Sequence, residues 1–295
     1  MDAIVAYQPQ ARTVRLDTET GAGEFAYLDF GPGERPVDAV FMHANGFNAR
    51  TYRTILGPLA GDLRILALDL RGHGRTPAPA EPLGRNTWLD LGHDLNTFLQ
   101  TLDLGPVVLA GHSMGGTLSL FAAADLPERV RALALFDPVV LPPERAAGGA
   151  PATSPLVHGA SRRRRHFDSR DAAVQSYRGR GAFTTWTEPM LLDYVEDGFR
   201  DVADGTVELA CAPEWEVSNY LAQGHDPWDA FARSRCPISI LRAEIASTCN
   251  VGSRIDQLTA DGRIRIETIP GTTHFLPMER PDLVRATLRA AIEAP

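Results

Sequence analysis

Short apolar segments alternate with longer amphipathic segments along most of the chain, which predicts strands and helices in turn. Six apolar segments are short enough to be buried strands of a parallel sheet, at residues 39–42, 64–68, 106–110, 132–136, 237–241 and 263–269. Helical spacing or continuous apolar character predicts helices over residues 86–102, 117–124 and 281–294, with Asn86 or Thr87 capping the first. The pattern is typical of an α/β fold.

The alternation is different at the N-terminal end and in the middle of the chain. Residues 13–16 and 24–28 predict an antiparallel hairpin around the Gly21-Ala22-Gly23 turn. From residue 142 to 223 the chain is rich in Pro, Gly, Arg and aromatic residues, with weaker helical stretches at 171–177 and 190–201. This segment, called the insert below, is too long for a loop, so we expect a helical covering element. Residues 1–141 and 224–295 then form the core.

Composition narrows the class of protein. The chain has 295 residues, 44% of them hydrophobic, which can bury a large core. A net charge of -8 argues against a nucleic-acid partner. The run Arg162–Arg165 could grip an anion, but we interpret it as a solvated face. Four carboxylates of the insert could select polar or cationic substrates, but we interpret them as solvated surface groups: Asp193, Glu196, Glu214 and Glu216.

No pattern indicates a metal, a disulfide framework or a membrane segment. The three cysteines lack C-x-x-C spacing, and motifs for zinc, phosphate or dinucleotide binding are missing, so we expect no cofactor. The N-terminus lacks a basic, apolar leader, and no run approaches the roughly 20 apolar residues of a membrane span. A cytoplasmic protein acting on a small molecule is the expectation; the sequence does not indicate an oligomeric state.

Gly111-His112-Ser113-Met114-Gly115 is the most informative motif. It follows an apolar strand and precedes an apolar helix. A sharp strand-to-helix turn would expose the Ser113 hydroxyl, and flanking glycines would remove side chains that collide there. Ser113 is therefore a candidate nucleophile, and it needs a base because serine is a weak nucleophile at neutral pH.

With three further segments, this motif resembles the α/β-hydrolase superfamily, and within it the capped, esterase-like serine hydrolases. The segments are His43-Ala44-Asn45-Gly46-Phe47, Asp69-Leu70-Arg71-Gly72-His73-Gly74 and Gly271-Thr272-Thr273-His274-Phe275. The resemblance implies a mostly parallel, twisted eight-stranded sheet flanked by helices, with a helical cap inserted after the sixth strand. It also implies that His274 is the general base.

The resemblance assigns the oxyanion donors. The backbone N–H of Met114, next to the nucleophile, is one of them. By matching His43-Ala44-Asn45 to the family's His-Gly-x pattern we assign the N–H of Asn45 as the second, although Ala44 replaces the usual glycine.

Two carboxylates are candidates for the acid of a catalytic triad with Ser113 and His274. Many relatives carry an aspartate after the seventh strand, but residues 241–248 contain only Glu244. The superfamily also uses the end of the sixth strand, where Asp137 lies. We favour Asp137 and keep Glu244 as the alternative.

We expect His43, Ala44, His112, Trp186 and Tyr194 near the substrate. The simpler interpretation of His43 is that it orders its loop by hydrogen bonds and takes no part in the chemistry. The simpler interpretation of the insert's aromatic residues is that they hold the insert together and do not line a pocket.

These residues together predict carboxylic ester hydrolysis through an acyl-enzyme. Carbon–carbon bond hydrolysis, lactone hydrolysis and cofactor-free perhydrolysis would use the same groups. A hydrolase-fold protein that only binds a ligand is the non-enzymatic alternative.

Overall fold

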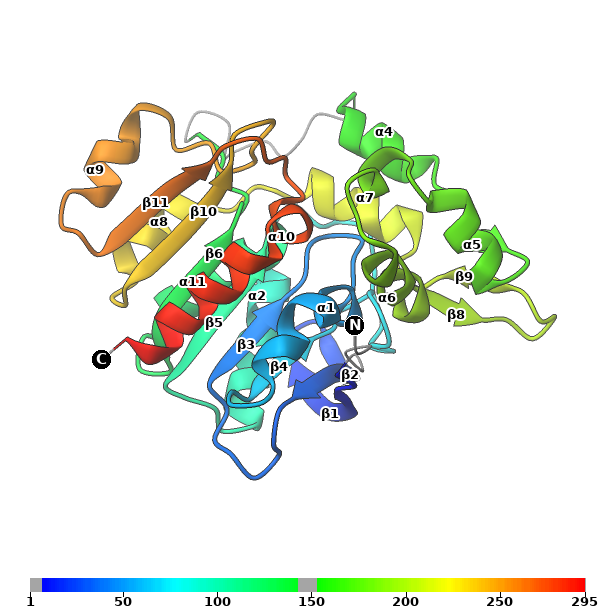
Figure 1. Ribbon diagram of the computed structural model, residues 1–295, viewed down its shortest axis with the longest axis horizontal. Coiled ribbons are helices and arrows are strands. Elements are labelled where there is room, and N and C mark those ends of the chain that lie inside the picture. The colour runs from blue at the N-terminus through cyan, green and yellow to red at the C-terminus, as the bar shows by residue number, and fades with distance from the viewer. Residues whose placement is uncertain (1–6, 143–152, 295) are drawn as a thin grey trace, which may run out of the picture.

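One eight-stranded sheet forms the centre of the molecule (Figure 1). The computed structural model describes residues 7–142 and 153–294. The strand order is β1-β2-β4-β3-β5-β6-β10-β11; β1 pairs antiparallel with β2 and β2 with β4, while the other neighbours are parallel. Their bounds are β1 Gln10–Thr18, β2 Gly21–Phe30, β3 Ala39–Met42, β4 Ile65–Leu68, β5 Val107–His112, β6 Val130–Phe136, β10 Ile238–Ala243 and β11 Ile264–Ile269. The predicted fold class is confirmed.

The N-terminal hairpin turns earlier than its glycines predict. Thr18 pairs with Gly21, so only Glu19 and Thr20 form the loop. Gly21 has a φ of 110° and begins β2, and the Thr18 hydroxyl donates to its carbonyl at 2.9 Å. The positive φ lies at the first residue after the two-residue loop, where glycine accepts it at little cost.

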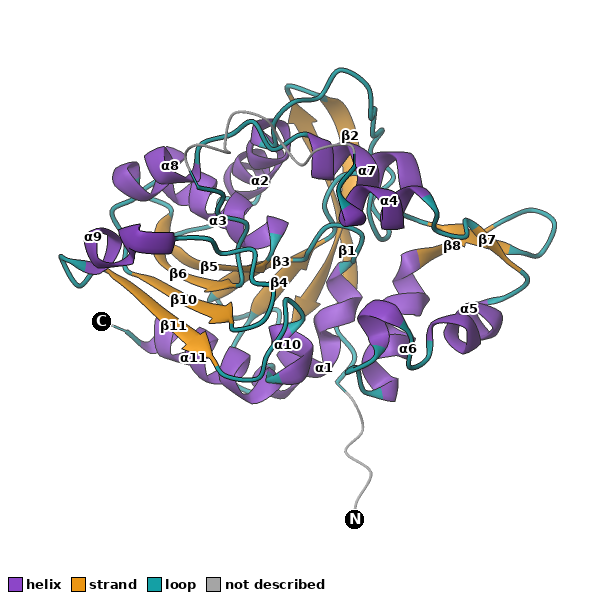
Figure 2. Ribbon diagram, turned by 90° about the horizontal axis from the view of Figure 1, so that it is seen from above, coloured by secondary structure: helices purple, strands orange, loops and turns teal. Residues whose placement is uncertain are grey.

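Helices cover both faces of the sheet (Figure 2). Helices α2 (Leu89–Thr101), α3 (Met114–Asp125) and α8 (Pro227–Arg233) lie on one face, and α1 (Arg53–Leu56) and α11 (Pro281–Glu293) lie on the other. Each face buries its own apolar cluster, for example Leu95 and Leu118 on the first and Ile55 and Val284 on the second. Short α9 (Ile255–Thr259) and α10 (Leu276–Glu279) flank β11.

Helix α2 begins three residues later than predicted. The predicted start was Asn86, whereas the helix begins at Leu89, whose N–H donates to the Thr87 hydroxyl at 3.2 Å. No described helix is long and apolar enough to cross a bilayer.

The described part of the insert, residues 153–223, is not wholly helical. It contains α4 (Pro155–Ser161), α5 (Arg170–Tyr177), α6 (Glu188–Gly198) and α7 (Pro213–Leu221). Strands β7 (His166–Phe167), β8 (Phe199–Asp201) and β9 (Val207–Leu209) add a small antiparallel sheet. These strands have two or three residues each, too few to show alternation. The predicted boundary at residue 142 adjoins residues outside the described ranges, and the division into core and insert stays a prediction.

Candidate active site

Ser113 lies on a strained turn between β5 and α3. Its φ and ψ are 54° and −122°, an uncommon conformation for a residue with a side chain. A Cβ on Gly111 would lie 2.4 Å from the carbonyl carbon of Gly115, and a Cβ on Gly115 would lie 2.4 Å from the carbonyl oxygen of Met42. Both glycines are needed because backbone occupies the space of a side chain, as the motif predicts.

Three predicted residues form one hydrogen-bonded chain. The Ser113 hydroxyl lies 3.0 Å from Nε2 of His274, and Nδ1 of the same ring lies 2.6 Å from Oδ2 of Asp137. A carboxylate can only accept, so the proton is on Nδ1 and Nε2 is left to accept from the serine. The loops carrying these residues follow β5, β6 and β11, whose carboxyl ends meet at one edge of the parallel sheet.

The Asp137 carboxylate is completely buried and fully hydrogen-bonded. Oδ1 accepts from the N–H of Ala243 at 2.9 Å and from the Ser247 hydroxyl, and Oδ2 accepts from the N–H of Thr248 at 3.0 Å. Burial raises the pKa of Asp137, but the bonds from His274, Ser247 and Thr248 outweigh it and bring the pKa to about 2. The group is therefore an anion beside the imidazole at neutral pH.

Glu244 takes a different position. Its Oε2 accepts from the backbone N–H of Gly271 at 2.8 Å, and its side chain is exposed. Among the described residues, Asp137 is the carboxylate hydrogen-bonded to the His274 ring. Glu244 instead fastens the turn that leads to that histidine.

His112 holds the backbone of His274. Its Nε2–H donates to the His274 carbonyl at 2.7 Å, while its Nδ1 lies 2.8 Å from the Tyr52 hydroxyl. That hydroxyl also accepts from the N–H of Ala44 at 3.2 Å. Burial lowers the pKa of His112 to about 3, so the ring is neutral and each nitrogen has one role.

The two residues predicted to supply the oxyanion donors line the same cavity as Ser113. Asn45 and Met114 both line it. Other N–H groups of the loop after β3 are used: Gly46 donates to Nε2 of His73, and Phe47 donates to the Ala44 carbonyl. Within the described residues neither the Asn45 N–H nor the Met114 N–H has a protein acceptor. These two groups are therefore available to a developing oxyanion.

The cavity above Ser113 has a volume of about 920 Å³. Of the predicted substrate-contacting residues, Ala44, His112 and Tyr194 line it. His43 and Trp186 are not among the described residues that line it, and for these two substrate contact stays a prediction. His43 accepts from the N–H of Leu70 through Nε2 and donates to the Ala44 carbonyl, so it orders its loop. The Trp186 ring packs edge-on against Phe47, with centroids 5.3 Å apart.

A buried ion pair that the sequence did not indicate forms part of the cavity wall. Arg163 donates to Oε2 of Glu216 and to the Tyr194 hydroxyl, each at 2.5 Å. We expected both charged groups to be solvated, yet the Glu216 side chain is 9% exposed and that of Arg163 17%. Residues 162, 164 and 165 are exposed as predicted. No periodicity distinguishes Arg163 from its three arginine neighbours.

The described residues contain no cluster of three or more His, Cys, Asp or Glu side chains that could hold a metal ion.

Comparison with known proteins identifies the fold family. Residues 39–287 match the model of the "Alpha/beta hydrolase family". The crystal structure of E-2-(acetamidomethylene)succinate hydrolase resembles this chain with a TM-score of 0.76 and 21% identity, covering 97% of this chain and all of that one. At this identity the likeness shows the fold alone.

Curated relatives carry several different activities in their names. The 2-(acetamidomethylene)succinate hydrolase of Mesorhizobium japonicum is 23% identical over 86% of this chain and 87% of its own length. The dihydrolipoyllysine-residue acetyltransferase component of the acetoin cleaving system of Pseudomonas putida is 35% identical over 40% of this chain and 31% of its own length. The chain spans between 31% and 57% of the length of the first curated relatives it matches.

Proposed function

This chain belongs to the α/β-hydrolase family, and we propose that it is a serine hydrolase that cleaves carboxylic esters of small or medium acyl groups. The observation that carries the proposal is the hydrogen-bonded chain from Asp137 through His274 to Ser113, which ends at a large cavity. This order of carboxylate, imidazole and hydroxyl is the arrangement that activates a serine for acyl transfer.

The mechanism follows from the positions of these groups. Nε2 of His274 takes the Ser113 proton as Oγ attacks the ester carbonyl carbon, and the resulting oxyanion accepts from the N–H groups of Asn45 and Met114. Collapse of this intermediate breaks the bond to the alcohol oxygen, which takes the proton from His274. Water then loses a proton to His274 and attacks the acyl-enzyme, releasing the acid and restoring Ser113. Asp137 stabilises the His274 imidazolium during both acylation and deacylation of Ser113.

A fluorophosphonate probe tests the nucleophile. We expect the wild type to be labelled and Ser113→Ala to lose the label. Ser154→Ala is the matched control because Ser154 lines the same cavity and should leave labelling unchanged. A folded wild type that takes no label would favour the alternative, a hydrolase-fold protein that only binds its ligand.

Hydrolysis of a carboxylate-bearing substrate is the second candidate. Among the described residues that line the cavity are two arginines, Arg163 and Arg180, and one carboxylate, Glu216. The relative from Mesorhizobium japonicum is named for a succinate derivative. Mono-4-nitrophenyl succinate and 4-nitrophenyl butyrate have similar length and differ in charge, so their kcat/KM ratio measures this preference. A ratio near one would exclude it.

Other reactions that use the same groups stay open as alternatives. Carbon–carbon bond hydrolysis of a diketone, lactone hydrolysis and perhydrolysis all need an activated serine and an oxyanion hole. A panel of acyl chain lengths and lactones separates them. A cytoplasmic location and a small-molecule substrate remain predictions from the sequence.

A further inference from the structure

The Asn45 side chain is held by helix α7 of the insert. Its Nδ2 donates to the Glu216 carbonyl at 3.0 Å, and its Oδ1 accepts from Nδ2 of Asn219 at 2.9 Å. Asn45 is 7% exposed and Asn219 is completely buried, so water does not compete strongly for these bonds. Asn45 lines the cavity and is thus anchored to a segment more than 170 residues away in the chain.

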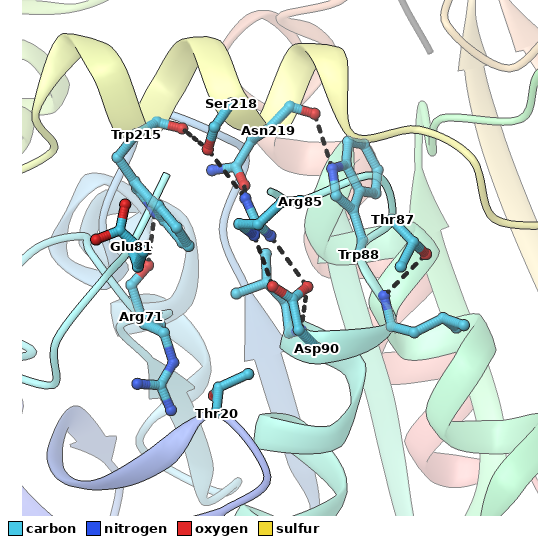
Figure 3. Close-up of polar contacts among 12 residues, drawn as sticks. Thr20, Arg71, Glu81, Arg85, Thr87, Trp88, Asp90, Trp215, Ser218 and Asn219 are labelled. Carbon is cyan, nitrogen blue, oxygen red and sulfur yellow. Dashed lines mark hydrogen bonds and ion pairs between the residues drawn. The ribbon is translucent and has the colours of Figure 1, made fainter. Parts of the chain in front are cut away.

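Arg85 sets the orientation of the Asn219 amide. Its Nη1 donates to Oδ1 of Asn219 at 2.6 Å, and its Nε and Nη2 donate to Asp90 at 2.6 and 3.0 Å (Figure 3). The guanidinium also lies 4.1 Å from the ring centroid of Trp215 on α7. An arginine can only donate, so Oδ1 of Asn219 must face it and Nδ2 must face Asn45. Oδ1 of Asn45 then faces Asn219, which leaves Nδ2 to bind the Glu216 carbonyl.

We propose that Arg85 and Asn219 are positioning residues that hold the Asn45 backbone N–H in the oxyanion hole, so that helix α7 of the insert completes the catalytic site. The inference rests on the proposed function. A donor serves the oxyanion only within a narrow distance, and a displacement of about 1 Å can cost about 100-fold in rate. The loop holding Asn45 contains Gly46 at a φ of 75°, so its own backbone conformation supplies little rigidity.

Replacement of the Asn219 amide is the direct test. We expect Asn219→Ala to lower kcat on 4-nitrophenyl butyrate about 10- to 100-fold with KM changed less than about threefold, because the lost contact acts on the transition state. Ser218→Ala is the matched control: Ser218 also accepts from Arg85, at 3.0 Å, but does not contact Asn45. Its kcat should stay at the wild-type value.

A double-mutant cycle separates positioning from a general structural role. Asn45→Ala keeps the backbone N–H and removes the same link. The double variant Asn45→Ala/Asn219→Ala should therefore lose no more activity than either single variant. Additive losses would overturn the inference. An alkyl boronic acid gives a second readout because its tetrahedral adduct on Ser113 places an oxygen in the oxyanion hole; its Kd should rise by the same factor as kcat/KM falls.

Asn219→Asp covers the case in which the alanine variant does not fold. The aspartate keeps the bond to Arg85 but presents an acceptor to Oδ1 of Asn45, so one repulsive contact results whichever way the Asn45 amide turns. We expect the same loss of kcat. Wild-type kcat in either Asn219 variant, with the wild type labelled by fluorophosphonate, overturns this inference alone. An unlabelled, inactive wild type overturns the proposed function instead.

Discussion

At the scale of single residues, Asp137 illustrates how a carboxylate can act from an unusual strand. Strand β10 pairs with β6 on one side and with β11 on the other, so the ends of these strands are neighbours. The carboxylate after β6 therefore reaches a histidine that follows β11. Asp137 has a φ of 43°, and its carbonyl accepts from the Thr248 hydroxyl at 2.8 Å, which fixes this turn against the loop after β10.

Asp137→Asn should lower kcat on an activated ester about 10³- to 10⁴-fold, because the amide no longer fixes the Nδ1–H tautomer or stabilises the imidazolium. Glu244→Gln should stay near the wild type, since Glu244 bonds to Gly271 rather than to the ring. Steady-state kinetics on 4-nitrophenyl acetate compare the two variants. Near-normal turnover of the Asp137 variant would show that another group serves the histidine.

Sequence motifs locate residues whose chemistry depends on a local turn, and they miss residues that meet through folding. Ser113 and Met114 follow from five consecutive residues because the elbow is local. Asn219 and Arg163 could not be predicted as site residues. Their importance depends on how α7 and the segment after α4 pack on the loop after β3, which no short-range pattern encodes.

At the scale of elements, helix α6 shows how the insert attaches to the core. Asp197 is buried, and its carboxylate forms ion pairs with Nε of Arg50 at 2.8 Å and Nε of Arg75 at 2.5 Å. The Asp193 carboxylate forms an ion pair with Nε of Arg53 at 2.6 Å. All three arginines come from loops or helices after β3 and β4, beside the candidate oxyanion loop. Asp193, which we expected on a solvated surface, and Asp197, for which we made no prediction from the sequence, thus dock α6 on the core.

Asp197→Asn should destabilise the protein by about 1–3 kcal/mol, because it leaves two arginines near a buried site with a weaker acceptor. The partial exposure of Arg50 and Arg75 keeps the loss below that of a fully buried pair. Glu196→Gln is the adjacent control: its carboxylate is 53% exposed and lies 3.5 Å from Arg75, so we expect less than about 0.5 kcal/mol. Urea unfolding measures both, and equal losses would contradict the assignment of Asp197 as the anchor.

The predictability of an element depends on its length. The strands of the large sheet have four to ten residues and were placed within a few residues, because buried apolar runs between turns carry a strong signal. Strands β7 to β9 gave no signal, and the hairpin turn was misplaced because three residues with two glycines suit several turns.

At the scale of the whole molecule, buried neutral histidines link the fold to pH. Four of the eight histidines are buried, and burial lowers the pKa of His43 and His225 to about 4 and of His112 to about 3, while that of His73 falls well below its usual value. The unfolded chain takes up these protons near pH 6.5, whereas the native state does not. Stability is therefore full above pH 6.5 and is lost as the pH falls toward 4.

Buried carboxylates oppose this trend in the same window. Burial raises the pKa of Asp69 to about 7, so the native state holds one proton that the unfolded chain releases. The pKa values of Asp94 and Asp193 are also raised by burial and reduce the slope further toward pH 4. Asp137 contributes stability above its unfolded pKa near 3.8, which is lost only below that pH.

On unfolding, the four buried histidines take up about four protons and Asp69 releases about one, a net uptake of about three. The free energy of unfolding should therefore fall by about 3–4 kcal/mol per pH unit as the pH drops from 6 to 5. Domains of this kind have about 5–15 kcal/mol in total, so we expect acid unfolding near pH 4 to 5. Urea titrations at pH 7, 6, 5.5 and 5 measure the slope.

His225→Asn should reduce this pH slope by about one proton, about 1.4 kcal/mol per pH unit, while exposed His158→Gln should leave it unchanged. A flat profile, or equal slopes in the two variants, would mean that these rings bind protons in the native state.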